Sequence, residues 1–179
     1  MKLAALARIV PKTDRTDSVQ TMMTFRSPPE KVWGAMMFYE EIPQRPSLLL
    51  RLSLPVPIRT RGDKTTPGSI IDCLYDGGTL EKRINDVEQA RSVRFEVLDQ
   101  RLGLERCMTM TGGSYELRPT VEGGTLLVLT TNYRAHLWPR FFFRPIEHAI
   151  AHAVHRHILV GMRTVLEGAP ALTGELAKV

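Results

Sequence analysis

The C-terminal part of the chain contains a helix pattern that limits the folds open to it. No proline occurs between Pro145 and Glu167, and Gly168 followed by Pro170 is the usual order at the end of a helix. Apolar and small residues recur at three- and four-residue intervals, which predicts a helix of about twenty residues with one inward face. That face comprises Ile146, Ile150, Ala153, Val154, His157 and Gly161. A helix of this kind must bury its apolar face against a broad surface, such as a sheet.

A strand is predicted near the N-terminus. Residues 18–26 alternate between two sides, which is the period of a half-buried strand. One side carries Val19, Thr21, Met23 and Phe25. This strand would bury that side against the rest of the fold.

A short helix is predicted directly after this strand. Ser27 stands three residues before Glu30, with prolines at positions 28 and 29, which is the pattern of a capping box with proline in the first turn. The helix is expected to end between Tyr39 and Pro43. Its apolar face would comprise Val32, Trp33, Met36 and Met37.

Five further strands are predicted at the spacing of successive hairpins. The glycine pairs Gly77-Gly78 and Gly123-Gly124 supply the positive φ angles that tight turns require. Gly112-Gly113 falls inside a strand, where it indicates a bulge or a sharp bend. The predicted strands are 69–76, 79–88, 91–100, 105–118 and 124–136. Together with the first strand they make an antiparallel sheet of about six strands.

Residues 43–68 do not follow either regular pattern. They contain five prolines, which exclude a long helix, together with a leucine run between Leu48 and Leu54. A short helix or strand over the mouth of a pocket is one interpretation, because long connections of this kind are often functional. The role of this segment stays open.

Length and composition indicate which class of protein this chain belongs to. A chain of 179 residues predicts one domain, residues 1–179, that needs neither a disulfide nor a structural metal. Cys73 and Cys107 form no CxxC pair and are expected to be ordinary small side chains, which suits the cytoplasm.

Arg8 interrupts the N-terminal apolar run before a signal peptide could form, and no apolar segment is long enough to span a membrane. The net charge of +5 comes from scattered arginines, so nucleic acid is not expected as a partner.

Two segments resemble a known family. FRSPPEKVWGAMMF (25–38) is similar to the strand-to-helix signature of the START-like superfamily, and LWPRFFFRPIEHAIAHAVHRHILVGMRTVLEG (137–168) is similar to its terminal helix. This superfamily, SRPBCC, is also called the polyketide cyclase/dehydrase and lipid-transport family. The resemblance covers about residues 18–168 and implies an α+β helix-grip fold, in which a curved antiparallel sheet wraps around a long C-terminal helix. Its members include carriers, receptors and enzymes, so it does not imply an activity.

A cavity between the sheet and the terminal helix is the expected binding site. Its walls would be strand residues of inward parity and the inner face of the helix, which suits an apolar small molecule with few polar anchors. Strand parity leaves five candidate anchors unassigned, namely Tyr39, Tyr75, Glu81, Arg83 and Tyr115. A closed core is the alternative. The predicted ligand-binding residues are Trp33, Met37, Phe95, Val97, Leu129, Thr131, Tyr133, Ile150, Ala153 and His157.

The terminal helix also carries four histidines. His157 lies on the predicted inner face, where an imidazole could orient a ligand or act as the catalytic acid or base; a core histidine with a hydrogen-bond partner is the alternative. His148, His152 and His155 share a second face, expected to be solvated or to contact a second copy in a homodimer. The pair at i and i+4 resembles a metal-binding helix, but alanine follows His148 where the zinc motif has glutamate, so no metal is expected.

The residues before this helix mix aromatic and basic side chains. Trp138, Phe141 and their neighbours, with Arg140 and Arg144, suit weak contact with a membrane surface. The alternative is that these aromatic side chains close the end of the barrel.

Three functions are consistent with these patterns. The first is binding of a small hydrophobic molecule of the lipid, polyketide or isoprenoid type, without a cofactor. The second is a polyketide cyclase- or dehydratase-like enzyme that uses acid–base residues of the pocket wall. The third is an interaction module with a closed core. The sequence contains no nucleophile elbow and no phosphate-binding or dinucleotide-binding glycine loop, so whether the chain is an enzyme stays open.

Overall fold

The computed structural model describes residues 16–38 and 57–168. This part of the chain contains one seven-stranded antiparallel sheet and two helices, α1 (Pro29–Phe38) and α3 (Arg140–Glu167). The strand order across the sheet is β1-β7-β6-β5-β4-β3-β2. The strands are β1 (Thr16–Phe25), β2 (Pro57–Arg61), β3 (Ile70–Tyr75), β4 (Gly78–Glu88), β5 (Ser92–Arg101), β6 (Met108–Pro119) and β7 (Thr125–Ala135).

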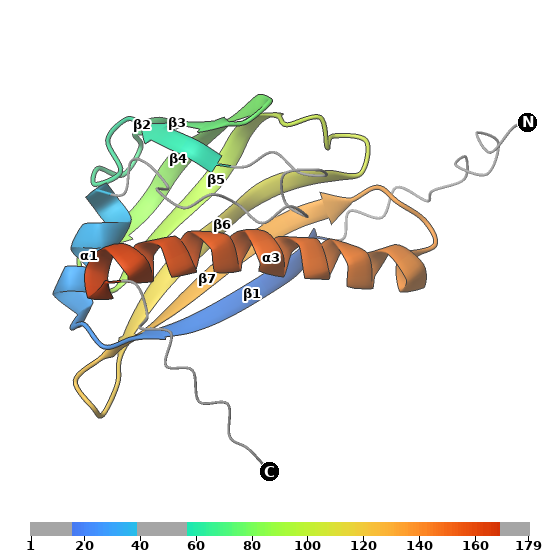
Figure 1. Cartoon of the computed structure of the whole chain (residues 1–179). Helices are drawn as coiled ribbons and strands as arrows, with labels where there is room; N and C mark the ends of the chain where they lie inside the picture. The colour runs from blue at the N-terminus through green and yellow to red at the C-terminus, as the bar shows by residue number, and fades with distance from the viewer. Residues whose placement is uncertain (1–15, 39–56, 169–179) are drawn as a thin grey trace, which may run out of the picture.

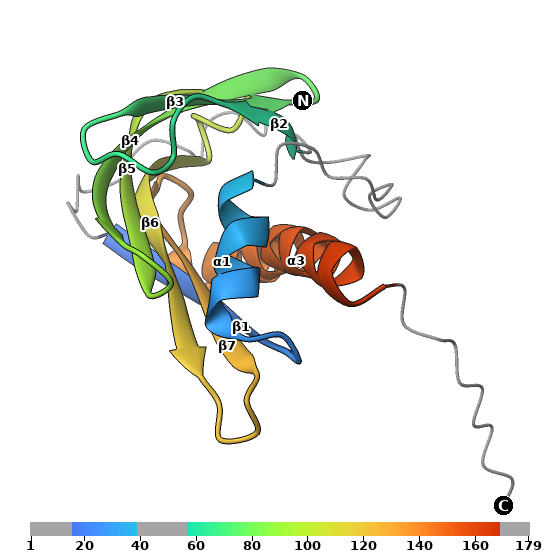
Figure 2. The ribbon, with the colours of Figure 1, turned by 90° about the vertical axis from the view of Figure 1, so that its left-hand side faces the viewer.

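The sheet curves around both helices. α3 runs across its concave face, and α1 packs beside the C-terminal end of α3 (Figures 1 and 2). The curvature has a local origin, because the ladder between β4 and β5 shifts register twice and the ladder between β6 and β7 shifts between Met110 and Gly112. Such bulges bend and twist the bulged strand. The predicted helix-grip architecture is therefore present, and the predicted bulge at Gly112-Gly113 is confirmed.

The alternating pattern near the N-terminus forms β1 as predicted. Val19, Thr21 and Phe25 are buried on one side of the strand, and β1 pairs along its whole length with β7. The glycine pairs at both predicted turns also have the required geometry, with φ of 89° at Gly77 and 80° at Gly123. These short-range signals were sufficient to place most hairpins.

The sheet has one strand more than predicted. The additional strand, β2, pairs with β3 at the edge of the sheet and lies in the proline-rich segment. Its short sequence, PIRTR, contains neither a full apolar alternation nor a turn signal, so the pattern did not reveal it. The leucine run and the predicted end of the first helix beyond Phe38 lie outside the described residues.

Helix α3 begins earlier than predicted. It starts at Arg140, so Pro145 lies inside its second turn instead of opening it. Proline at this position removes the hydrogen bond to the carbonyl of Phe141. Phe141 is 83% exposed, so water can pair with that carbonyl and the helix continues through the proline.

The core lies between the concave face of the sheet and the two helices. Its members are buried aliphatic and aromatic side chains, each of which stabilises the fold by about 1.5–3 kcal/mol on burial. Cys73 belongs to this core, as predicted, whereas Cys107 is half-buried and lies outside it. The most deeply buried members are Phe25, Val32, Leu80, Ile84, Leu127, Leu159 and Met162.

Candidate functional site

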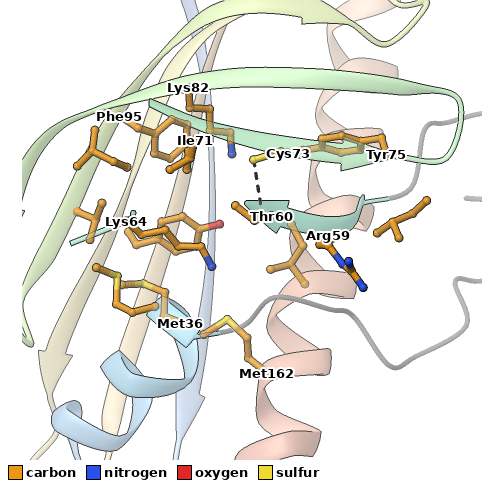
Figure 3. Close-up of a pocket in the computed structure, with 16 residues that line it drawn as sticks. Met36, Arg59, Thr60, Lys64, Ile71, Cys73, Tyr75, Lys82, Phe95 and Met162 are labelled. Carbon is orange, nitrogen blue, oxygen red and sulfur yellow. Dashed lines mark hydrogen bonds between the residues drawn. The ribbon is translucent and has the colours of Figure 1, made fainter. Parts of the chain in front are cut away.

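A cavity lies beneath helix α3, between the sheet and α1 (Figure 3). It leaves about 110 Å³ open to the centres of water molecules. A single buried water needs only about 10–15 Å³ by this measure, so the space suits a small organic molecule better than one structural water. Its lining residues are Met36, Met37, Ile58, Arg59, Thr60, Lys64, Ile71, Cys73, Tyr75, Lys82, Ile84, Val93, Phe95, Tyr115, Ile158 and Met162.

A second cavity adjoins the first, further along α3. It leaves about 80 Å³ open by the same measure. The two cavities share part of their walls, namely Tyr75, Lys82, Phe95, Tyr115 and Ile158. They therefore offer adjoining space for one elongated molecule. The second cavity is lined in addition by Leu80, Val97, Leu102, Leu104, Met108, Met110, Gly112, Leu129, Thr131, Tyr133, Ile150, Ala151, Val154 and His155.

Most of the predicted ligand-binding residues border these cavities. Trp33, Ala153 and His157 do not line either one, and Trp33 packs against the core instead. The residues that do line them are Met37, Phe95, Val97, Leu129, Thr131, Tyr133 and Ile150. Their role in binding a ligand stays a prediction. The open volume of the two cavities argues against the alternative of a closed core.

The inner face of α3 agrees with the predicted one in part, since Gly161 is buried and Ile150 and Val154 line the second cavity. Its buried residues include Glu147, His155, Leu159 and Met162, whereas Ile146 is 44% exposed. The apolar periodicity was misleading because two polar residues, Glu147 and His155, face the sheet and find partners there. His157 was placed on the inner face by the same reasoning.

His155 connects α3 to the sheet. Its Nδ1 lies 2.9 Å from Oγ1 of Thr21 in β1, and its Nε2 lies 2.8 Å from Oγ1 of Thr131 in β7. His152 Nδ1 lies 2.8 Å from the same Thr21 oxygen. The prediction of a solvated or dimer-contacting face for these histidines is thus wrong for His155, which is 3% exposed.

Acid is expected to destabilise the fold through His155. Burial, followed by the nearby His152 and Lys82, lowers the pKa of His155 to about 4. An unfolded imidazole titrates near ~6.5, so between these values only the unfolded chain binds the proton. The free energy of unfolding should therefore fall by roughly 2 kcal/mol from about pH 7 to pH 5, with no further loss from this group below its folded pKa. Urea unfolding across this range measures the slope.

The control is His155→Gln, which removes the titrating group. This variant should be less stable at neutral pH but should show a flatter dependence on pH. An equally steep slope in the variant would assign the acid sensitivity to other groups.

His157 and His148 have a different environment. The Nε2 atom of each is buried and has no hydrogen-bond partner within the described residues. Burial lowers the pKa of His157. Since His157 borders neither cavity, its candidacy as the catalytic residue has no support from its position. No group of three or more metal-ligating side chains occurs among the residues described.

Lys82 is the site residue that sequence reasoning missed. It follows the inward parity of Leu80 and Ile84 on β4, and its Nζ lies 4.4 Å from the centre of the Phe95 ring. Figure 3 shows the ammonium directed into the cavity beside Cys73. The alternation from Leu80 to Ile84 places Lys82 on the inward side of β4 and was the available signal. It was missed because a lysine is not expected at an inward position. By contrast Arg83, one of the candidate anchors, forms an ion pair with Glu96 away from the cavity, at 2.9 Å.

The groups around Lys82 affect its charge. Burial opposes the ammonium form, but the Cys73 thiol and the hydroxyl groups of Tyr75 and Tyr115 outweigh it and raise the pKa of Lys82. Burial also raises the pKa of Tyr75 to about 12 and raises that of Tyr115. At neutral pH the two phenols are therefore uncharged hydrogen-bonding groups. Tyr75 and Tyr115 are the two candidate anchors that line the cavity, and Tyr39 lies outside the described residues.

An ion-pair cluster around the buried Glu147 holds the N-terminal half of α3. Glu147 accepts two hydrogen bonds from Arg140, both at 2.8 Å, and a third from the hydroxyl of Tyr133 at 3.1 Å. Arg140 also binds Asp17 of β1 at 2.6 Å. The hydrogen bonds to Glu147 contribute most to raising the pKa of Arg140. This cluster ties α3 to both β1 and β7 at one end of the second cavity.

The aromatic residues before and at the start of α3 are exposed. Trp138 is 60% exposed, Phe141 83% and Phe142 57%. They therefore do not close the end of the barrel, because they point into solvent. Contact of Trp138 and Phe141 with a membrane surface stays a prediction. Among the residues described, no helix has the length and apolar character needed to cross a membrane.

Comparison with known proteins finds likeness at the level of structure. No protein-family model matches the chain, and no curated protein matches it by sequence. Norcoclaurine synthase from Thalictrum flavum, in complex with dopamine and hydroxybenzaldehyde, has a TM-score of 0.57 at 13% identity over 84% of this chain and 86% of that one.

Two further solved structures are similar to the same extent. The Zhui aromatase/cyclase from Streptomyces sp. R1128 has a TM-score of 0.54 at 15% identity over 84% of this chain and 96% of that one. The Aha1 dimer from Colwellia psychrerythraea has a TM-score of 0.55 at 14% identity over 85% and 98%. Identities this low show a shared fold alone.

Proposed function

Since the chain has the START-like helix-grip fold, we propose that it binds a small hydrophobic ligand of the lipid, polyketide or isoprenoid type beneath α3. The observation that carries this proposal is the pair of adjoining cavities with mostly apolar walls and a few polar groups. This is the usual composition of a small-molecule site. The similar norcoclaurine synthase structure contains two small aromatic molecules, which supports the use of this fold for such ligands.

Binding is favoured over the alternative of a cyclase- or dehydratase-like enzyme. A general acid or base works best with a pKa near the working pH. In the cavity walls, the pKa values of Lys82, Tyr75 and Tyr115 are raised and that of His155 is lowered to about 4. These shifts move each group away from neutrality, which suits fixed hydrogen bonding and charge better than proton transfer.

The experiment is to fill the cavity and measure binding of a neutral apolar probe. Ile158 borders both cavities, so tryptophan at this position should occupy the space. We expect wild-type protein to bind N-phenyl-1-naphthylamine with a rise in fluorescence. Ile158→Trp should weaken that affinity by about tenfold or more, because the probe and the indole compete for one volume, and tenfold corresponds to ~1.4 kcal/mol.

The matched control is Val165→Trp on the same helix, where the side chain is 58% exposed. It adds the same indole outside the cavity and should leave probe affinity unchanged. No binding by the wild type, or equal affinities in the two variants, would contradict the proposal. Native mass spectrometry of protein purified from its host would then weigh any molecule that co-purifies.

A further inference from the structure

The charge in the cavity wall is of one sign. The first cavity is lined by three basic side chains, Arg59, Lys64 and Lys82, and neither cavity is lined by an aspartate or glutamate among the described residues. Glu96 precedes Val97, the partner of Lys82 in the ladder between β4 and β5, but its carboxylate pairs with Arg83. A purely apolar ligand would leave the Lys82 ammonium without an opposite charge.

Lys82 carries most of this argument, because it is the basic residue common to both cavities. Its side chain contacts the face of the Phe95 ring and lies beside the Cys73 thiol, which also accepts a hydrogen bond from Thr60 at 3.8 Å. No ion pair joins Lys82 to a carboxylate within the part of the chain that the structure describes. A ring face and a thiol are weak partners for an ammonium, and buried charges are normally paired.

We propose that the ligand carries an anionic group, a carboxylate, which binds the Lys82 ammonium, while its apolar body lies beneath α3. This inference rests on the proposed function and specifies the class of its ligand. The neutral hydroxyls of Tyr75 and Tyr115 line the same wall and can donate hydrogen bonds to the carboxylate. The raised pKa of Lys82 also favours the ammonium form.

The walls also indicate how such a ligand lies. Lys82 belongs to the section shared by the two cavities, and from there the second cavity continues along apolar side chains that include Val97, Leu129 and Ile150. A carboxylate on Lys82 would therefore place an apolar tail along the underside of α3. The acid end would be fixed by charge and the tail by burial, which predicts selectivity for the head group and tolerance in the tail.

The experiment compares two probes that differ only in the head group. Decanoate and decan-1-ol are each titrated at neutral pH into protein loaded with N-phenyl-1-naphthylamine, and displacement is read from fluorescence. Wild-type protein should bind decanoate about tenfold or more tightly than decan-1-ol, since a charge-assisted hydrogen bond is worth ~1.5–3 kcal/mol. Lys82→Met should remove this preference, and Lys82→Arg should retain much of it.

The control variant is Arg83→Met on the same strand. It removes one positive charge outside the cavity, where Arg83 is 47% exposed, so the preference for decanoate should persist. Equal affinity of the wild type for the two probes, or an unchanged preference in a folded Lys82→Met variant, would overturn the inference while leaving the proposed function intact. Absence of N-phenyl-1-naphthylamine binding to the wild type would instead overturn the proposed function, and this inference with it.

Discussion

Replacing Gly113 by alanine should destabilise the fold by about 3 kcal/mol or more. Gly113 is buried in β6, between its ladder partners Phe95 and Thr131. A Cβ atom at this position would overlap the carbonyl oxygen of Thr130 and lie 2.9 Å from Cζ of Phe95. The oxygen belongs to the backbone of the adjacent strand, so it can move away only by opening the ladder between β6 and β7. Urea unfolding measures the loss.

Gly34 provides the matched control. It lies in α1, and a Cβ atom added there meets nothing within 4 Å. Gly34→Ala should therefore stabilise the fold by roughly 0.5–1 kcal/mol, because alanine loses less conformational entropy in a helix than glycine does. If both substitutions had small effects, the close approach of β6 to β7 at Gly113 would be refuted.

Removing the buried carboxylate of Glu147 should cost about 3 kcal/mol. Glu147→Ala breaks both hydrogen bonds with Arg140 and leaves the hydroxyl of the fully buried Tyr133 without its acceptor. Asp17 continues to neutralise part of the Arg140 charge, which limits the loss. Equilibrium urea unfolding of the variant at neutral pH gives the value.

The comparison for this prediction is Glu96→Ala, which also removes one carboxylate from an ion pair with arginine. The Glu96 side chain is 40% exposed and that of Arg83 is 47% exposed. Exposed pairs contribute only about 0–1 kcal/mol, so this variant should remain close to the wild type. Similar losses in the two variants would show that burial does not decide the contribution of Glu147.

The architecture could be predicted because its signals are local. Alternation in β1, glycine pairs at the turns and the proline-free stretch before Gly168 each depend on residues close in sequence. β2 was missed for the opposite reason: its five residues are held by pairing with β3, and their sequence alone carries no strand period. The start of α3 differs from the predicted one because proline is usual in the first turn of a helix, whereas here the exposed second turn contains it.

The site was predictable on the strands, where alternation separates inward from outward side chains. Parity on β5 and β7 correctly placed Phe95, Val97, Leu129, Thr131 and Tyr133 at the cavity. On α3 the same reasoning selected His157 over His155, because hydrophobicity says nothing about a polar residue whose partners are supplied by distant strands. Thr21 and Thr131, the partners of His155, are more than a hundred and more than twenty positions away, respectively.

The pairing of β1 with β7 has a consequence for synthesis of the chain. Phe25 pairs with Thr125, and Thr21 meets His155. During translation β1 leaves the ribosome early, but its ladder partner emerges about a hundred residues later, and chains elongate at only ~5–20 residues per second. For several seconds the nascent chain exposes a strand edge with nothing to bind. The ladder between β1 and β7 is therefore expected to form late, and contacts so distant in sequence slow folding.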